Sequence, residues 1–341
     1  MGTGAATRLP FTVIGGFLGA GKTTLLNRWL REAGAAGQRL AVLVNDFGAL
    51  NIDAALVAEH SGDTVALTNG CVCCQIGDDL SLALIRVLEQ PGRFDAVVVE
   101  ASGVSDPWRI AQLGRADPGL VLDGVIVLVD AAAVQAQSRD RLLADTLERQ
   151  LLRADLVVLN KADLAGAAAV AEARAWVSRV APAAAQCEAT QADVPLSLLS
   201  GRALLATSDG AYLAHVCGPG CAHAQGVVHA AHGEVFETWS CRPEAVFPAA
   251  LLRDWLKAVP AGVLRAKGLL RTDEHGWSEL QFAGQHGVLR RAEAPASGAA
   301  FVVIGLRGRL PVGELEAVFG GFDEGRGARP VPQRTGAQAR A

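Results

Sequence analysis

Long apolar runs are missing from this sequence. The chain of 341 residues has a mean hydropathy of +0.26, yet no run approaches the roughly 18 to 20 apolar residues that a membrane-spanning helix needs. Its most hydrophobic stretch, residues 119–134, is interrupted by Asp123 and Asp130. Met1–Pro10 also lacks the apolar core of an export signal. These absences argue against a membrane protein and lead us to expect a cytoplasmic one.

A surplus of basic residues is missing as well. The 31 Lys and Arg residues and 35 Asp and Glu residues give a net charge of -4, which argues against nucleic acid as the main partner. Cysteine is sparse and unevenly placed, with Cys71, Cys73 and Cys74 in one cluster and Cys217 and Cys221 in another. Clustered thiols without an export signal indicate metal or thiol chemistry rather than a disulfide framework.

Short apolar runs alternate with helical patterns over the first two thirds of the chain. The expected strands cover residues 11–15, 40–44, 65–67, 96–100, 124–130 and 156–160. The expected helices cover residues 22–32, 79–90, 107–113, 139–152 and 168–180. This alternation predicts a doubly wound α/β fold with a mostly parallel sheet that is covered by helices on both faces.

The pattern breaks near residue 206, where Gly, His and Cys accumulate and apolar periodicity ends. Beyond residue 232, closely spaced strand patterns and two helical patterns predict a smaller α+β domain with an antiparallel sheet. We therefore expect a P-loop domain at 8–205, a His- and Cys-rich linker at 206–232, a C-terminal domain at 233–322 and a disordered tail at 323–341.

A phosphate loop, Gly16–Thr23, fits the pattern G-x-x-x-x-G-K-[ST] in full. It follows an expected strand and opens an expected helix, where backbone N–H groups and the helix N-terminus bind phosphates. We expect Lys22 to reach the β- and γ-phosphates and the Thr23 hydroxyl to bind Mg²⁺. The residues predicted to contact the nucleotide here are Gly16, Gly19, Ala20, Gly21, Lys22, Thr23 and Thr24.

A base-reading loop, Asn160–Asp163, has the pattern N-K-x-D at the end of an expected strand. The Asp163 carboxylate can accept hydrogen bonds from N1 and N2 of guanine, which adenine cannot supply. We expect Asn160 to join this loop to the phosphate loop and the Lys161 stem to cover the base. The pattern predicts GTP and disfavours a P-loop kinase or ATPase. Ala189–Thr190 is expected to complete the base pocket.

Glu100 ends an apolar strand and Gly103 follows it. A carboxylate there can hold Mg²⁺ directly or through water. The Gly103 N–H can contact a γ-phosphate, and this contact is lost on hydrolysis. Asp46 follows the second strand, where nucleotide switches carry a sensing loop, so it is a candidate for orienting water or binding metal. An ordinary turn is the alternative for Asp46. The candidate catalytic residues are Lys22, Asp46, Glu100 and Gly103.

Three thiols, Cys71, Cys73 and Cys74, follow an Asn-Gly turn. Thiolates bind Zn²⁺, and a closed structural site needs four ligands, so three thiolates leave one position open. An open position suits a site that exchanges its metal with another protein. Thiolates also allow Co²⁺ or Cu(I). Buried thiols without a metal are the alternative.

A second metal site is expected in the linker. His215, Cys217, Cys221 and His223 supply two thiolates and two imidazoles, a complete tetrahedral set that favours Zn²⁺. This site should be the weaker one, because a mobile loop loses conformational entropy when it closes on a metal. A flexible linker without metal is the alternative.

Together these motifs resemble the CobW-like family of metal-handling GTPases. The resemblance spans about residues 10–320 and depends on Gly15–Thr24, Asn45–Gly48, Ile52–Asp53, Asn69–Cys74, Glu100–Pro107, Asn160–Asp163 and Arg265–Gly268. It implies a GTPase domain joined to a smaller C-terminal domain, a C-x-C-C metal site coupled to the nucleotide, and delivery of metal, often zinc, to a client protein. The chain departs from the family at Asp46, where Glu is usual, and at Ala49, where an acidic residue often stands.

The sequence therefore predicts a GTP-hydrolysing metallochaperone that carries zinc, or a related metal such as Co²⁺, to a client metalloprotein. Two alternatives stay open: a metal buffer or sensor with incidental GTP hydrolysis, and an accessory that inserts cobalt or iron for cobalamin synthesis or nitrile hydratase activation. Neither nucleic acid nor a membrane is an expected partner, and the sequence leaves the oligomeric state open.

Overall fold

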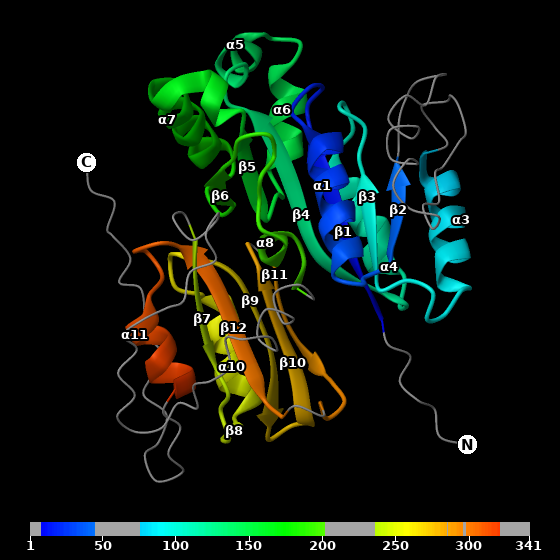
Figure 1. The fold of residues 1–341 in the computed structure, drawn as a ribbon, viewed down its shortest axis with the longest axis vertical. Coiled ribbons are helices and arrows are strands. Elements are labelled where there is room, and N and C mark those ends of the chain that lie inside the picture. The colour runs from blue at the N-terminus through cyan, green and yellow to red at the C-terminus, as the bar shows by residue number, and fades with distance from the viewer. Residues whose placement is uncertain (1–7, 45–75, 202–235, 285, 296–297, 321–341) are drawn as a thin grey trace, which may run out of the picture. The chain divides into compact units, whose positions relative to one another are not determined.

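The computed structural model describes residues 8–44, 76–201, 236–284, 286–295 and 298–320 (Figure 1). The chain divides into two compact units. The first is Met1–Ala203 with Ala283–His286, and the second is Leu204–Phe282 with Gly287–Ala341. No helix within the described ranges is both long enough and apolar enough to cross a lipid bilayer.

The first unit contains a six-stranded sheet in the order β2-β3-β1-β4-β5-β6, and all neighbouring strands in it are parallel. Its strands are β1 (Leu9–Gly16), β2 (Leu40–Val44), β3 (Ala96–Glu100), β4 (Leu120–Asp130), β5 (Leu156–Asn160) and β6 (Ala185–Glu188). The chain passes from β1 to β2 at one edge, returns to β3 beside β1, and then adds β4, β5 and β6 in turn on the other side of β1, as in a doubly wound P-loop fold. The predicted fold class is confirmed, and the carboxyl ends of β1, β3 and β4 meet where the strand order reverses.

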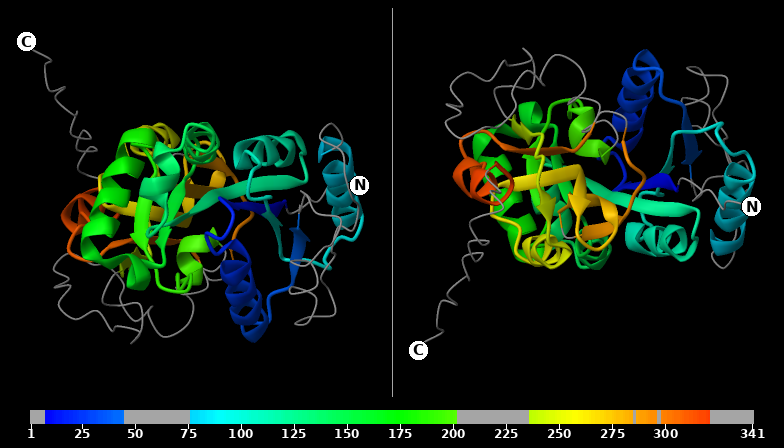
Figure 2. Two further views of the ribbon diagram at one scale, coloured as in Figure 1. Left: turned by 90° about the horizontal axis from the view of Figure 1, so that it is seen from above. Right: turned by 90° about the horizontal axis from the view of Figure 1, so that it is seen from below.

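Helices cover both faces of this sheet. They are α1 (Lys22–Ala35), α3 (Ile76–Leu88), α4 (Pro107–Ala116), α5 (Val134–Arg139), α6 (Ala144–Leu151), α7 (Ala162–Val180) and α8 (Leu196–Leu199). Helices α1 and α4 lie on opposite faces (Figure 2). One core combines buried strand residues such as Phe11 and Val97 with Ile110 of α4, Leu147 of α6 and Trp176 of α7. Strands buried on both faces explain the continuous apolar runs in the sequence.

The helix predicted at 139–152 is present as α6, but α6 is shorter, since it begins at Ala144 and ends at Leu151, and the separate helix α5 ends at Arg139. Asp140, near the predicted start, has extended backbone angles and accepts a hydrogen bond from Leu142 N at 2.8 Å, so it lies outside the helix. A short polar side chain that bonds nearby backbone competes with the helix in this way. Helix α7 begins earlier than predicted, at Ala162, and Gly166 interrupts it with a φ of 74°.

The second unit is a sheet in the order β11-β10-β9-β12-β7, to which β8 adds a short parallel pairing with β9. Strand β12 runs antiparallel to both β7 and β9, in agreement with the predicted α+β domain. Its strands are β7 (Phe236–Cys241), β8 (Val246–Phe247), β9 (Val263–Thr272), β10 (Gly276–Ala283), β11 (His286–Arg291) and β12 (Ala300–Leu306).

Helix α10 (Ala249–Lys257) packs against this second sheet through aromatic side chains. Trp255 is almost fully buried, and its ring meets Phe301 and Phe319 edge-on at centroid distances of 5.8 and 5.2 Å. Edge-to-face contact is a preferred geometry of aromatic pairs. Phe319 belongs to a π-helical turn, Glu316–Gly320, that follows α11 (Val312–Leu315).

Candidate nucleotide-binding site

The phosphate loop joins the carboxyl end of β1 to the first turn of α1. Gly21 has a φ of 104°, a left-handed conformation that favours glycine. A Cβ atom on Gly21 would lie 2.4 Å from Asn160 Nδ2, so the two loops can approach this closely only at a glycine. The Lys22 side chain is buried, and its Nζ donates a hydrogen bond to the Phe17 carbonyl at 3.3 Å. All residues predicted to contact phosphate lie in this loop and the first turn of α1.

Thr23 and Glu100 meet at the edge of the phosphate loop. Thr23 Oγ1 donates a hydrogen bond to Glu100 Oε1 at 3.0 Å. The pairing of Ile14 with Glu100 across β1 and β3 brings the carboxylate to this place, where it is 3% exposed. A hydroxyl and a carboxylate are oxygen ligands of the kind that Mg²⁺ prefers. The structure thus brings together the two residues predicted to hold Mg²⁺, and their donor atoms fit that ion.

The loop after β3 lies against the phosphate loop. A Cβ atom on Gly103 would lie 2.4 Å from Leu18 Cδ2 and 3.0 Å from Leu18 N, so a larger residue would push the two loops apart. Ser105 N donates to Ser102 O at 3.0 Å, which closes a turn around Gly103. The loop ends where Asp106 caps the first turn of α4. Gly103 therefore lies next to the loop that is expected to bind phosphate.

Asn160 hydrogen bonds the base-reading loop to two other loops. Its Nδ2 donates to the Ala20 carbonyl at 2.8 Å, and its Oδ1 accepts from Ala192 N at 2.8 Å. Asn160 is 2% exposed, so protein groups take the place of water for both ends of this amide. The predicted link to the phosphate loop is present, and a second link to the loop after β6 adds to it.

Lys161 forms an ion pair with Asp130, the last residue of β4. Lys161 Nζ lies 2.6 Å from Asp130 Oδ2, and the two side chains are largely shielded from solvent. Asp130 pairs with Asn160 across β4 and β5, so both residues reach the same edge of the sheet. This ion pair restrains the lysine stem that we predict to cover the base. Asp130 was not predicted as a site residue, although its position at the end of a buried strand matches that of Glu100.

Asp163 lies in the first turn of α7 and is exposed. Beside it, Ala162 N donates to the carbonyl of Ala189, the residue predicted to help complete the base pocket, at 3.1 Å. The same loop after β6 is joined to α1 by an ion pair between Asp193 and Arg28. Asp163 can therefore meet a ligand at the junction of three restrained segments. Asp193 was not predicted as a site residue either, because it belongs to no local motif.

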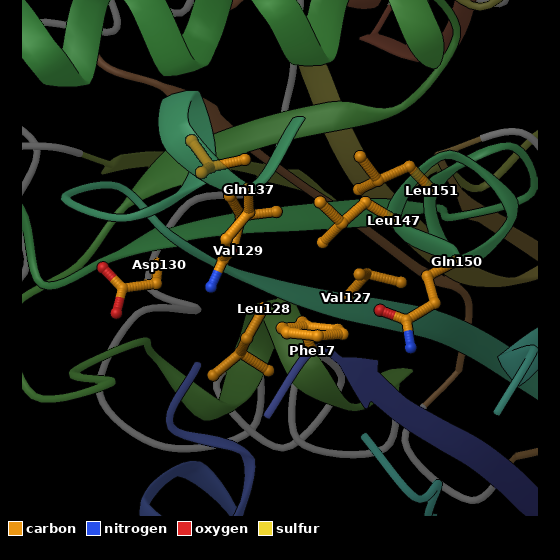
Figure 3. A pocket seen from close by; sticks show the side chains of 10 residues that line it. Phe17, Val127, Leu128, Val129, Asp130, Gln137, Leu147, Gln150 and Leu151 are labelled. Carbon is orange, nitrogen blue, oxygen red and sulfur yellow. The ribbon is translucent and has the colours of Figure 1, made fainter. Parts of the chain in front are cut away.

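A small pocket borders this site (Figure 3). Its lining comes from the phosphate loop, the end of β4 and helices α5 and α6, and consists of Phe17, Val127, Leu128, Val129, Asp130, Val134, Gln137, Leu147, Gln150 and Leu151. The pocket shares Phe17 and Asp130 with the elements that form the nucleotide site.

The predicted transition-metal ligands fall outside the described residues. They are Asp46, Cys71, Cys73, Cys74, His215, Cys217, Cys221 and His223. The expected strand at 65–67, the linker at 206–232 and the tail at 323–341 lie outside them too. Within the part of the chain that the structure describes, no three His, Cys, Asp or Glu side chains are grouped to hold a metal ion. The metal sites stay predictions from the sequence.

Two further cysteines are core residues. Cys187 in β6 is fully buried, and burial raises the pKa of its thiol to about 12. The thiol is therefore protonated at neutral pH, a state that does not suit a metal ligand. Cys241 in β7 is 2% exposed and packs into the aromatic core of the second unit. Burial in the core accounts for both residues.

A phosphate loop after the first strand, a carboxylate at the end of the adjacent strand and an N-K-x-D loop define a P-loop nucleotide-binding protein. The family model of the CobW/HypB/UreG nucleotide-binding domain matches residues 10–188. The model of the cobalamin synthesis protein CobW C-terminal domain matches residues 236–322. The chain belongs to this family, which confirms the resemblance seen in its motifs.

Several characterised proteins are similar to the chain. A zinc chaperone CobW from a Sinorhizobium species is 34% identical over 231 residues, which cover 59% of this chain and 65% of that protein. The zinc chaperone YjiA of Escherichia coli is 36% identical over 196 residues, which cover 55% of this chain and 59% of that protein. The zinc-regulated GTPase metalloprotein activator 1 of Schizosaccharomyces pombe is 34% identical over 182 residues, which cover 50% of this chain and 43% of that protein. The chain thus spans less than two thirds of the length of each relative.

Among solved structures, a Zn(II)-bound YjiA GTPase from Escherichia coli is similar to the chain, with 22% identity and a TM-score of 0.43. The alignment covers 91% of this chain and 98% of that one.

Proposed function

We propose that this protein is a GTP-hydrolysing metallochaperone of the cytoplasm. It binds zinc, or a related transition metal, through Cys71, Cys73 and Cys74 and delivers the metal to a client metalloprotein in a nucleotide-dependent way. The names of its relatives, zinc chaperone and zinc-regulated GTPase metalloprotein activator, support zinc as the cargo and a protein as the acceptor. The strongest structural support is the Asn160 side chain, which joins the phosphate loop to the base-reading loop.

The nucleotide is GTP, because Asp163 supplies a carboxylate where a base would lie. Guanine offers two N–H groups to that carboxylate, whereas adenine has no donor at N1 and no amino group at C2. The buried amide of Asn160 sets the distance between the phosphate loop and Asp163, since it bonds Ala20 directly. The spacing between the two loops therefore suits one nucleotide that contacts both.

Hydrolysis joins a water oxygen to the γ-phosphorus, breaks the bond from that phosphorus to the bridging oxygen, and releases GDP, inorganic phosphate and a proton. Lys22 stabilises the negative charge on the β- and γ-phosphates, and Glu100 or Asp46 orients the water. Thr23 and Glu100 would hold Mg²⁺, which would neutralise phosphate charge when bound. The Gly103 N–H donates a hydrogen bond to the γ-phosphate and loses it when phosphate leaves.

The metal site responds to the nucleotide through the chain between β2 and β3. Asp46 and the three thiols belong to this connection, which follows β2 and precedes β3, the strand that ends in Glu100. Shifting a two-state segment from 1:99 to 99:1 requires about 5.5 kcal/mol of differential binding, and contacts to a γ-phosphate can supply it. Loss of the γ-phosphate therefore loosens the thiolates and releases the metal.

Zinc release from the loaded protein tests this function. With a chromogenic zinc chelator as the acceptor, we expect release to accelerate with GTP but not with a non-hydrolysable GTP analogue. Changing Cys71, Cys73 and Cys74 to Ala should remove the GTP-dependent release and leave GTP binding intact. Cys187→Ala, which removes a buried thiol elsewhere, is the matched control.

Two results would contradict the proposal. One is zinc binding at full affinity in the triple variant, which would place the metal elsewhere. The other is equal release with GTP and with the analogue, which is the behaviour of a metal buffer or sensor in which hydrolysis is incidental.

A further inference from the structure

A buried amide side chain on α6 is hydrogen bonded to the loop after β3 at two points. Gln150 is 3% exposed. Its Nε2 donates to the Gly103 carbonyl at 2.9 Å and to the Ser105 carbonyl at 3.1 Å. Both N–H groups of one amide are therefore used on a single short loop that lies far from Gln150 in the sequence.

Gly103 is restrained by the phosphate loop as well. The contact with Leu18 leaves no room for a Cβ atom, and the carbonyl of Gly103 is held by Gln150. Among the described residues, no group accepts a hydrogen bond from the Gly103 N–H. The position of Gly103 is therefore defined while its N–H can still bind a ligand.

The surroundings of Gln150 indicate that its amide acts on the loop. It lines a mostly apolar pocket together with Phe17, Leu147 and Leu151 (Figure 3). Burying an amide among such side chains costs free energy unless its polar atoms are hydrogen bonded. An apolar side chain of similar size would fill the same space without that cost, so packing alone does not require glutamine here.

We propose that Gln150 is a positioning residue that holds Gly103 where its N–H meets the γ-phosphate of a bound nucleoside triphosphate. This inference rests on the proposed function, because it concerns the same nucleotide site. A loop that is already ordered loses less conformational entropy when a ligand binds. A nucleoside diphosphate has no γ-phosphate and gains nothing from this order. Gln150 therefore favours binding of the triphosphate over the diphosphate.

Gln150→Met tests the proposal, because methionine keeps similar volume without a hydrogen-bond donor. We expect the affinity for the non-hydrolysable analogue GMPPNP to fall about tenfold, or about 1.4 kcal/mol, while that for GDP changes by less than about twofold. The kcat of GTP hydrolysis should fall as well. Isothermal titration calorimetry measures both affinities.

Gln137→Met is the matched control. Gln137 lines the same pocket, and its side chain makes no hydrogen bond to any other described residue. Its replacement should leave the ratio of GMPPNP affinity to GDP affinity unchanged.

If Gln150→Met loses affinity for GMPPNP and for GDP by the same factor, the role of Gln150 is purely structural and the proposal is overturned. Unchanged affinity for both nucleotides would also overturn it. If the methionine variant does not fold, Gln150→Asn decides the question, because it keeps an amide one methylene too short to bond both carbonyls. It must then show the same selective loss, and an equal loss would overturn the proposal.

Failure of the proposed function gives a different result. Wild-type protein that prefers adenine nucleotides, or does not hydrolyse GTP, contradicts the GTPase. The role of Gln150 is then decided by the same affinity ratio, measured with the triphosphate analogue and diphosphate that the wild type does bind. A wild type that binds no nucleotide overturns both.

Discussion

Asp163 is exposed to solvent, whereas the polar groups of Asn160 and Lys161 contact other protein groups. Asn160 is buried and bonded to Ala20 and Ala192, and Lys161 is paired with Asp130. Asp163 is exposed in the first turn of α7. The neighbours thus hold the base-reading loop in place, and we propose that the exposed Asp163 carboxylate selects the base.

Asp163→Asn should therefore change the base preference. The amide places an N–H group opposite the N–H groups of guanine, so GTP affinity should fall at least about a hundredfold. Xanthosine triphosphate, which carries a carbonyl oxygen in place of the guanine amino group, should bind the variant better than GTP does. Competition against a fluorescent nucleotide measures the affinities of the variant and the wild type for GTP, ATP and xanthosine triphosphate.

Asp145→Asn is the control for this change, because Asp145 is an exposed carboxylate on α6 and should not affect any nucleotide. An Asp163→Asn protein with the wild-type order of affinities would show that another residue recognises the base.

At the level of secondary-structure elements, one charge cluster joins three strands of the second unit. Lys267 Nζ of β9 lies 2.9 Å from Glu279 Oε1 of β10, and Arg290 Nη2 of β11 lies 2.5 Å from Glu279 Oε2. Burial raises the pKa of Glu279, but the two cations outweigh burial and hold that pKa below its ordinary value of 4.5. The carboxylate is therefore ionised at neutral pH and stabilises the three strands.

Glu279→Gln should lower the free energy of unfolding by about 3 kcal/mol at neutral pH, because Lys267 and Arg290 lose this carboxylate inside the protein. The pKa of Glu279 is lower in the folded state, so its stabilisation is complete above the ordinary value of 4.5 and declines as the pH falls below it. Urea unfolding of both proteins across this pH range measures the difference.

Glu274→Gln is the control, since Glu274 pairs with Arg253 at the surface and such pairs contribute at most about 1 kcal/mol. If the difference between wild type and Glu279→Gln does not shrink in acid, the ion pairs are not its cause.

In the molecule as a whole, the nucleotide site belongs to the first unit, and the proposed linker metal site lies in sequence between the two sheets. Deleting residues 215–232 should lower the zinc content by about one ion per chain, because two thiolates and two imidazoles form one tetrahedral set. GTP affinity should stay the same. Elemental analysis of protein purified without added metal measures the zinc.

Deleting residues 326–341, a segment of similar length without Cys or His, is the control and should leave the zinc content unchanged. An unchanged zinc content in the 215–232 deletion would rule out the linker site.

Much of the fold and several site motifs were predictable because they depend on contiguous residues. The phosphate loop and the N-K-x-D loop are short patterns, and the alternation of buried strands with helices predicts the parallel sheet. The predicted start of α6 was wrong, because Asp140 has extended backbone angles and its side chain accepts a hydrogen bond from Leu142 N in front of the helix. Prediction also missed Asp130 and Gln150, which belong to no motif.

Amino-acid order was enough to indicate the family, the doubly wound class and the residue types at the phosphate and base positions. It could not show which distant residues meet. Thr23 with Glu100, Asn160 with Ala20 and Gln150 with Gly103 are separated by 77, 140 and 47 residues. These contacts exist because the sheet order β2-β3-β1-β4-β5-β6 differs from chain order. That order follows from packing the whole core, which no local pattern encodes.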